Sequence, residues 1–376
     1  MDHDQPGPSS DSPPPEQPKP AAKPTTSPDP KRPFPWLLTG IVLVIVASAS
    51  GLVAAVNAYN HSRNLVSAST ITTPATKPSP NVLNNQSSAT NVWKSTVNPA
   101  DIPLGDTKVS TTPKVGYVDS CTTTFKSAAT QQSDPWINTA AGTWDAATKP
   151  AVNGSVMWSN AAYSNVVSGN NRIITTNDLP VNEPTGVFPI TPTDPAYQYD
   201  RNPNHIAAQN LSYTLPLNPT PAATAGCTRL GPIGVLTDGV VLFNALDAAG
   251  RDAVAHEIQD SCGGHPDGSN MYHYHDVSPC LMSKATGSST LVGYALDGYG
   301  IYVERNAQGN LPTNADLDAC HGRTSPVMWN GKLTDMYHYD ATLEYPYTVG
   351  CFHGTPVTNS TSSNPAPAPS QAAIVP

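Results

Sequence analysis

Two similar stretches of the sequence are Gly234-Val-Leu-Thr-Asp-Gly-Val-Val-Leu-Phe243 and Gly293-Tyr-Ala-Leu-Asp-Gly-Tyr-Gly-Ile-Tyr302, and they are the strongest indication of its fold class. In each, short apolar runs flank Asp-Gly, a dipeptide suited to a tight hairpin turn. We therefore expect two strands joined at Asp238-Gly239 in the first stretch. Gly, Asp, Asn and Pro also interrupt the surrounding sequence every several residues, and only residues 251–259 indicate a helix. The predicted fold class is mainly β (a β-rich α+β fold).

The similarity continues downstream of both stretches. In chain order, the further matching elements are Asp-x-Cys-x-Gly (residues 260–264 and 318–322), Met-Tyr-His-Tyr (residues 271–274 and 336–339) and a closing cysteine (Cys280 and Cys351). Four elements repeated in one order predict two copies of one β-rich unit, at about residues 232–280 and 292–351. We expect the apolar faces of these units to pack together around a pseudo-twofold axis.

The repeat also predicts how the cysteines pair. All six lie between residues 121 and 351, and an even number beyond an apolar segment indicates three disulfides formed in an oxidising compartment. If the two units are equivalent, each contains one bond within itself. The predicted pairs are Cys262–Cys280, Cys320–Cys351 and, for the remainder, Cys121–Cys227.

Composition divides the 376-residue chain into five parts, because proline is densest toward its two ends. We expect a disordered Pro-rich cytoplasmic segment (1–35), a transmembrane helix (36–56), a Ser/Thr/Pro-rich linker (57–112), one folded domain (113–355) and a disordered tail (356–376). Lys31 and Arg32 precede the apolar span, so the positive-inside rule places the N-terminus in the cytoplasm and the domain outside the cell membrane. The alternative is a signal peptide cleaved near Ala49 or Ala58.

Several partners and chemistries are disfavoured. The net charge is −9 and the central region has no Lys/Arg cluster, which argues against binding to nucleic acid. The chain has no P-loop, dinucleotide fingerprint or Gly-x-Ser-x-Gly elbow, so we expect no nucleotide cofactor and no serine nucleophile of that kind. His256-Glu257 lacks a second histidine four residues after His256, and no His-Glu-x-x-His zinc motif exists.

Histidines are the strongest candidates for a functional site. In a strand over residues 272–275, His273 and His275 share one face, and two imidazoles so spaced can bind one zinc or copper ion. The second copy offers His338 and Asp340. The two pairs either converge on one four-ligand site or each form half of a separate site. Weaker candidate ligands are His265, His321 and His353. The alternative interpretation is that these histidines form hydrogen bonds within a polar core.

Four aspartates and the tyrosines have structural alternatives too. Asp238 and Asp297 fit turn chemistry better than acid–base catalysis. Asp260 and Asp318 precede cysteines, and either cap a loop or act on a substrate. Exposed tyrosines could stack on sugar rings, although most should pack in the core or in cross-strand pairs.

Taken together, these motifs resemble the YHYH-domain family. The matching segments are Pro232-Ile-Gly-Val235, Asp260-Ser-Cys-Gly-Gly-His-Pro266, Met271-Tyr-His-Tyr-His275, Gly293-Tyr-Ala-Leu-Asp-Gly-Tyr299 and Tyr345-Pro-Tyr-Thr-Val-Gly-Cys-Phe-His353, with Gly116-Tyr-Val-Asp-Ser-Cys121, Pro135-Trp-Ile-Asn138 and Gly142-Thr-Trp-Asp145 upstream. The resemblance covers nearly all of residues 114–354. It implies a secreted or surface-anchored protein and carries no settled activity. Asp340 departs from the Tyr-His-Tyr-His pattern that is common in the second motif, which shifts the preference toward harder metal ions.

Three functions follow as hypotheses. The first is an extracytoplasmic domain that binds zinc or copper through His273, His275, His338 and Asp340. The second is a cell-wall or glycan-binding module with structural histidines. The third is a metal-dependent hydrolase, so the sequence leaves open whether the protein is an enzyme.

Overall fold

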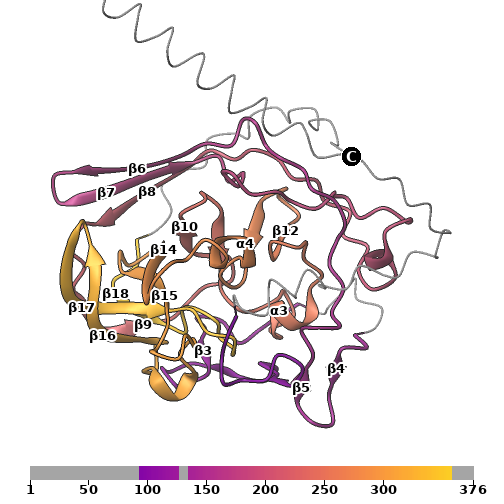
Figure 1. Cartoon of the computed structure of the whole chain (residues 1–376), viewed down its shortest axis with the longest axis horizontal. Helices are drawn as coiled ribbons and strands as arrows, with labels where there is room; N and C mark the ends of the chain where they lie inside the picture. The colour runs from indigo at the N-terminus through magenta and orange to yellow at the C-terminus, as the bar shows by residue number, and fades with distance from the viewer. Residues whose placement is uncertain (1–92, 127–133, 358–376) are drawn as a thin grey trace, which may run out of the picture. The chain divides into compact units, whose positions relative to one another are not determined.

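The computed structural model describes residues 93–126 and 134–357 (Figure 1). The predicted cytoplasmic segment at 1–35 and membrane span at 36–56 lie outside these residues, as does nearly all of the predicted tail. Among the helices of the described residues, none has both the length and the apolar character that a membrane span requires.

Strands dominate the described residues, which confirms the mainly β prediction. The largest sheet contains eight strands, and in Figure 1 it extends from β12 near the centre of the folded region to β16 and β17 at its left side. In spatial order they are β12 (Gly264–Pro266), β13 (Tyr272–Tyr274), β11 (Val241–Phe243), β10 (Pro232–Leu236), β14 (Ser289–Ala295), β15 (Gly300–Glu304), β17 (Lys332–Asp340) and β16 (Gly322–Trp329).

The strand order follows the same pattern on both sides of the central β10–β14 pair. On each side an antiparallel hairpin comes first, and its second strand pairs in parallel with a Tyr-His-Tyr strand. That strand then pairs antiparallel with the strand after the Asp-x-Cys loop. At the centre, Val235 lies opposite Tyr294, and these positions are equivalent in the sequence repeat. The arrangement is consistent with the predicted repeat, while the twofold relation itself stays a prediction.

The two Asp-Gly hairpins form as expected. Gly239 and Gly298 both have φ of +92°, a backbone conformation that residues with a side chain rarely adopt. Asp238 Oδ1 accepts a hydrogen bond from the backbone N–H of Val240 at 3.1 Å. Aspartate and glycine therefore have complementary roles in the turn, one satisfying a backbone donor and the other supplying the positive φ.

The predicted helix at 251–259 is only one turn long. Helix α3 spans Ala253–His256, and Asp252 caps its N-terminus by accepting from the backbone N–H of Ala255 at 3.3 Å. Glu257 already has an extended backbone, with φ of −85° and ψ of 141°. The early end of the helix turns the chain toward the Asp-x-Cys loop.

Smaller elements surround the central sheet. A three-stranded sheet of β6, β7 and β8 runs along the upper edge of Figure 1, and Thr176 Oγ1 at the end of β7 donates to the carbonyl of Gly239 at 2.6 Å. The remaining bounds are β1 (Ile102–Pro103), β2 (Val109–Ser110), β3 (Val118–Asp119), β4 (Ile137–Asn138), β5 (Thr143–Trp144), β6 (Tyr163–Ser168), β7 (Asn171–Thr176), β8 (Leu211–Pro216), β9 (Pro221–Gly226), β18 (Phe352–Gly354), α4 (Pro279–Met282), η1 (Pro195–Gln198) and η2 (Asn314–Asp316). Strands β1 and β2 precede residue 113, so folded structure begins earlier than the predicted domain boundary.

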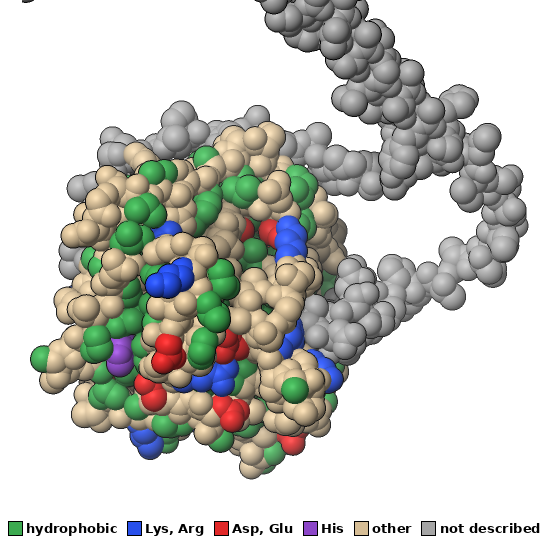
Figure 2. All heavy atoms as spheres, turned by 60° about the vertical axis from the view of Figure 1, so that its left-hand side comes forward, with side chains coloured by type: hydrophobic (Ala, Val, Ile, Leu, Met, Phe, Trp, Pro, Cys, Tyr) green, Lys and Arg blue, Asp and Glu red, His purple; other side chains and the backbone are tan. Residues whose placement is uncertain are grey.

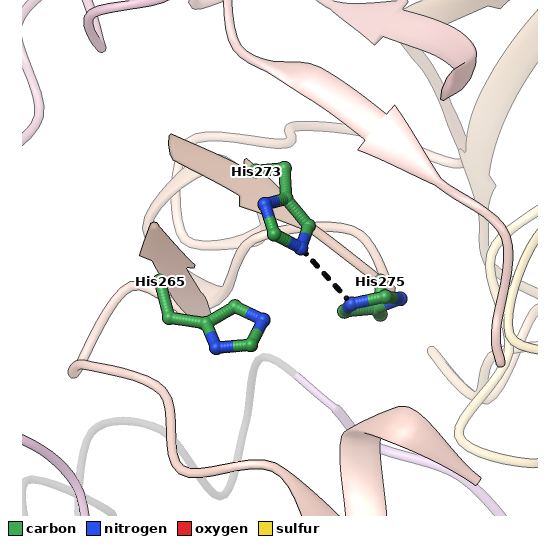
Figure 3. A group of neighbouring side chains, drawn as sticks. All are labelled: His265, His273 and His275. Atoms are coloured by element: carbon green, nitrogen blue, oxygen red, sulfur yellow. Dashed lines mark hydrogen bonds between the residues drawn. The ribbon is translucent and has the colours of Figure 1, made fainter. Parts of the chain in front are cut away.

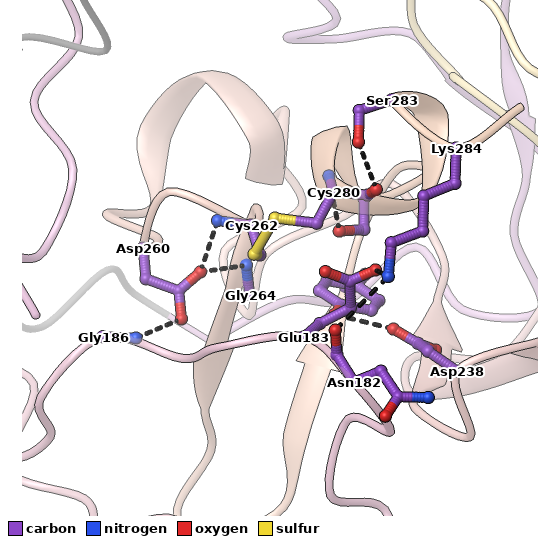
Figure 4. Close-up of a disulfide and its surroundings, with 12 residues drawn as sticks. Asn182, Glu183, Gly186, Asp238, Asp260, Cys262, Gly264, Cys280, Ser283 and Lys284 are labelled. Atoms are coloured by element: carbon purple, nitrogen blue, oxygen red, sulfur yellow. Dashed lines mark hydrogen bonds and ion pairs between the residues drawn. A yellow bond between two sulfur atoms is a disulfide. The ribbon is translucent and has the colours of Figure 1, made fainter. Parts of the chain in front are cut away.

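Three disulfides connect the domain, and the pairing agrees with the prediction from the repeat. They join Cys121 to Cys227, Cys262 to Cys280, and Cys320 to Cys351. The last two each tie an Asp-x-Cys loop to the chain that follows, and Figure 4 shows Cys262–Cys280 with Asp260 beside it. These bonds limit the freedom of the unfolded chain and hold the loops that carry the candidate site.

Candidate metal centre

Each Tyr-His-Tyr strand is held in place by its tyrosines. Tyr272 OH donates to Asp260 Oδ2 at 2.8 Å, and Tyr274 OH donates to Asp238 Oδ2 at 3.0 Å. Asp260 also accepts from the backbone N–H of Cys262 at 2.9 Å, which fixes the Asp-x-Cys loop. All these groups are buried, so an unpaired partner would be costly. Both aspartates therefore serve the framework, as the turn and loop-capping interpretations predicted.

The second half repeats these contacts. Tyr337 OH donates to Asp318 Oδ1 at 3.0 Å, and Tyr339 OH donates to Asp297 Oδ2 at 2.5 Å. Side chains alternate along a strand, so anchoring the tyrosines on one face directs the intervening histidine to the other. The motif thus separates a structural face from a face that is available for chemistry.

Three imidazoles gather where β12 pairs with β13 (Figure 3). His265 lies opposite His273 in the antiparallel pair, and His275 follows directly after β13. The Nε2 atoms of His273 and His275 are 3.2 Å apart. Phe243 of β11 stacks on the His273 ring, with centroids 3.9 Å apart, and covers one side of the cluster with an apolar surface. All three histidines are buried.

Hydrogen bonds define the tautomers of two of these rings. His273 Nδ1 donates to the carbonyl of Met271 at 3.2 Å, and His275 Nδ1 donates to the carbonyl of Asn244 at 2.5 Å. Because a carbonyl oxygen only accepts, both Nδ1 atoms carry a proton, and each ring has a lone pair at Nε2 when it is neutral. The two Nε2 atoms lie 3.2 Å apart. Their repulsion is relieved when a proton or a metal ion lies between them.

A carboxylate completes the cluster. Glu257 Oε2 lies 3.2 Å from His265 Nε2 and 3.0 Å from His275 Nε2. The Glu257 side chain is 25% exposed, but its Oε2 atom is buried. This oxygen and both ring nitrogens of His265 lack a hydrogen bond, because the geometry between them is unfavourable. Buried polar atoms that converge without hydrogen-bonding geometry are the arrangement expected around a cation.

Burial and neighbouring charges shift three pKa values in the cluster. Burial opposes ionisation of Glu257, but the charges of His265 and His275 outweigh burial and hold the pKa of Glu257 well below its usual range. Burial, together with the charges of His265 and His275, keeps the pKa of His273 well below the usual value. Burial also acts to lower the pKa of His275, yet Glu257 raises it above the usual value. The cluster therefore combines the ionised carboxylate of Glu257 with the neutral imidazole of His273.

Three ligand separations in the cluster are close to those around a tetrahedral ion. Zinc–ligand bonds of about 2.0–2.1 Å place neighbouring ligands of a tetrahedron about 3.3–3.4 Å apart. Glu257 Oε2 lies 3.2 Å from His265 Nε2 and 3.0 Å from His275 Nε2, and the Nε2 atoms of His273 and His275 are 3.2 Å apart. The ligand atoms of His265, His273 and His275 lie within 4.8 Å of one another, and Glu257 is not part of that group, so its side chain must move before all four ligands can reach one zinc or copper ion. The Nδ1–carbonyl hydrogen bonds are the outer contacts that orient metal-binding histidines.

A second cluster lies in the other half. Glu304 of β15, His338 and Asp340 of β17 offer ligand atoms within 4.8 Å of one another. Arg323 of β16 contacts both acids, with Nη2 2.8 Å from Glu304 Oε2 and Nε 3.0 Å from Asp340 Oδ2. Burial raises the pKa of Asp340 to about 7 despite Arg323. Burial opposes ionisation of Glu304, but His338 and Arg323 lower its pKa to about 2.

The two pairs of predicted ligands do not meet. Four strands lie between β13 and β17 in the sheet, so strand spacing separates these strands by about 24 Å. The pair His273 and His275 therefore cannot share one ion with His338 and Asp340. The β10–β14 pairing at the centre is the physical reason, because it places the Tyr-His-Tyr strands on opposite flanks. Of the two alternatives, the structure shows separate clusters.

The weaker candidates divide in the same way. His265 joins the first cluster. His321 is buried, with Nε2 2.9 Å from Thr342 Oγ1, and burial lowers its pKa to about 3. His353 stacks on Tyr337 with centroids 3.7 Å apart. Neither His321 nor His353 belongs to a group that could hold a metal among the described residues.

A third group of ligand-type atoms is structural. Glu183 lies near Cys262 and Cys280, but the two sulfurs are bonded to each other (Figure 4). Glu183 instead forms an ion pair with Lys284. This group therefore offers no thiolate to a metal.

Sequence reasoning missed Glu257, Glu304 and Arg323. His256-Glu257 drew attention only as an incomplete zinc motif, and its neighbour His256 in fact pairs with Asp106 and Asp134 at 2.9 Å each. Arg323 had a detectable signal, because it occupies the position of His265 when the Asp-x-Cys-x-Gly motifs are aligned. The two glutamates have no equivalent positions in the repeat, and only the folded chain brings them to the histidines.

The fold and the first cluster define a disulfide-linked, mainly β domain with a buried histidine–carboxylate centre. The model of the YHYH protein family matches residues 212–313. The predicted resemblance is therefore confirmed for this region, which contains Glu257 and all three histidines of the first cluster. The second Tyr-His-Tyr strand lies beyond the matched residues.

Two other comparisons found no match. No curated protein matches the chain. No solved structure matches it either.

Proposed function

We propose that this protein is a membrane-anchored, extracytoplasmic domain that binds one zinc or copper ion through His265, His273, His275 and Glu257. The observation that carries the proposal is the gathering of three buried imidazoles, two of which lie within 3.2 Å of a buried carboxylate oxygen. Soft-to-intermediate nitrogen ligands with one carboxylate suit these two metals. The second cluster, formed by Glu304, His338 and Asp340, contains one histidine where the first contains three, and the proposed ion does not require it.

The proposed location rests on different features. The apolar span at residues 36–56 and the preceding Lys31 and Arg32 support anchoring with the N-terminus in the cytoplasm. Three disulfides in the folded region support an oxidising environment for the domain. The metal would then be captured on the outer side of the membrane.

The ligand number favours a closed site over a catalytic one. Catalytic zinc generally has three protein ligands and one open position, whereas structural zinc has four protein ligands. Here the fourth position is supplied by Glu257, whose metal-facing oxygen is buried. We therefore propose metal capture or metal-dependent stabilisation as the role of the centre, rather than hydrolysis.

Metal analysis of the full chain tests the proposal. The protein is expressed without a polyhistidine tag, purified in detergent, stripped with a chelator and reloaded with zinc or copper. We expect about one equivalent per chain at saturation. The double variant His273→Ala/His275→Ala should lose that ion, whereas His205→Ala, which removes an exposed histidine outside both clusters, should retain it. Full retention by the double variant would refute the site.

A further inference from the structure

Strand pairing relates the two clusters residue by residue. In the first half His265 lies opposite His273, with Gly264 opposite Tyr274. In the second half Arg323 lies opposite His338, with Gly322 opposite Tyr339. Arg323 is thus the counterpart of His265, and Asp340, directly after Tyr339, is the counterpart of His275.

The framework around these positions is retained. His338 Nδ1 donates to the carbonyl of Met336 at 3.1 Å, just as His273 Nδ1 donates to Met271 at 3.2 Å. The close packing of glycine against tyrosine is also common to both halves, since a Cβ at Gly322 would lie 2.4 Å from Tyr337 Oη. The second half therefore presents His338 in the orientation that a metal ligand requires.

The chemistry within the framework differs. Two carboxylates, from Glu304 and Asp340, face one imidazole, and the guanidinium of Arg323 lies between the carboxylates. A metal ion would make the same bridging contacts. The Arg323 side chain is 33% exposed, whereas the acids and the imidazole are nearly inaccessible. The Arg323 guanidinium thus reaches the two buried carboxylates from the solvent side.

The positive charge of Arg323 compensates the two carboxylates of this cluster, but several buried polar atoms of the cluster still lack a hydrogen bond. His338 is fully buried, and its Nε2 has no hydrogen bond, lying 3.5 Å from Glu304 Oε2 and 3.8 Å from Asp340 Oδ2. Neither oxygen of the buried Asp340 has hydrogen-bonding geometry. A positively charged side chain that fills a ligand cluster while leaving ligand atoms unsatisfied resembles a substitute for an ion.

The surface around this half shows the same mixture of charges. In Figure 2, where the side of the molecule that carries β16 and β17 comes forward, acidic and basic side chains lie next to one another. An open pocket of about 150 Å³ adjoins the cluster and is lined by Arg323, Arg305 and Asp316 among others. Solvent ions therefore have a route to Arg323.

We propose that Glu304, His338 and Asp340 form a latent second metal site, in which the Arg323 guanidinium takes the place of the ion. The native chain then binds one ion, in the first half, and gains a second when Arg323 is replaced. Two carboxylates and one imidazole suit zinc or manganese. The inference rests on the proposed function only in using the first cluster as its template.

The test compares metal stoichiometry between variants of the full chain. Arg323→His restores the residue found in the first half, and Arg323→Gln removes the charge while keeping a long polar side chain. We expect each to bind about one more zinc equivalent than the native chain, and His338→Ala added to Arg323→His to abolish the gain. Arg323→Lys retains the positive charge and should bind the native number. Circular dichroism and the thermal midpoint confirm folding of every variant.

The proposal depends on the difference in zinc stoichiometry between each variant and the native chain, and not on the total number of ions bound. If the first site fails to bind metal, Arg323→His should still gain one ion relative to the native chain, so failure of the proposed function is distinguishable. Native protein that binds an ion through His338 would overturn the inference, because the guanidinium would not exclude it. An unchanged stoichiometry in folded Arg323→His or Arg323→Gln would overturn it as well. Manganese titration followed by electron paramagnetic resonance supplies a second readout.

Discussion

The buried carboxyl of Asp238 should make the domain less stable as the pH rises. Asp238 accepts hydrogen bonds from Tyr274 and the backbone of Val240, but burial dominates and raises its pKa to about 7. The unfolded group has a pKa near 3.9. Between these values the folded state holds a proton that the unfolded state has lost. Folding therefore becomes less favourable as the pH rises from about 4 to 7, by roughly 4 kcal/mol for this group.

Equilibrium urea unfolding at pH 4.5 and pH 7.5 measures this contribution. The native chain and Asp238→Asn are compared with disulfides intact and a chelator present, so that metal binding does not contribute. Asparagine keeps an acceptor for the backbone of Val240 but cannot ionise. Relative to Asp238→Asn, the native chain should lose roughly 3 kcal/mol of unfolding free energy between the two pH values. If the difference in unfolding free energy between the two proteins is the same at both pH values, Asp238 does not have the raised pKa.

Three further outcomes are expected. A free metal concentration of about 100 times the dissociation constant of the first site should stabilise the domain by about 2.7 kcal/mol. Calorimetry should then show a thermal midpoint about 5–10 °C higher. The His205→Ala variant should show the same increase, whereas His265→Ala should not. Acidification should release the ion, because metal ligation requires unprotonated imidazoles; equilibrium dialysis that shows constant affinity from pH 8 to pH 5 would contradict this. Cys320→Ser/Cys351→Ser should cost about 2–5 kcal/mol in denaturant unfolding, and a cost below measurement error would show that this loop needs no covalent support.

Much of the local architecture was predictable because it depends on short-range chemistry. The Asp-Gly turns form where glycine supplies the positive φ, and the tyrosines and histidines of residues 272–275 separate by strand alternation. The pairing of Cys262 with Cys280 followed from repeated motifs. The helix at 251–259 was overestimated, because two apolar residues at helical spacing do not show where the backbone becomes extended.

The composition of the clusters was less predictable. His273 and His275 were named from their spacing, yet Glu257 comes from the extended chain after α3. Glu304 likewise lies at the end of β15, with no acidic counterpart in the first half. Candidate ligands contributed by different elements have no fixed sequence spacing, so the tertiary fold alone brings them together.

The Asp-Gly turns, the disulfide partners and the shared face of His273 and His275 could be inferred from the amino-acid sequence, because they depend on neighbouring residues and on a visible repeat. The approach of His265 and Glu257 to His273 and His275, and of Arg323 to Glu304 beside His338, depends instead on the folded chain. The order of strands in the sheet explains this difference. Pairing β10 with β14 at the centre places the Tyr-His-Tyr strands about 24 Å apart and gives each its own neighbours.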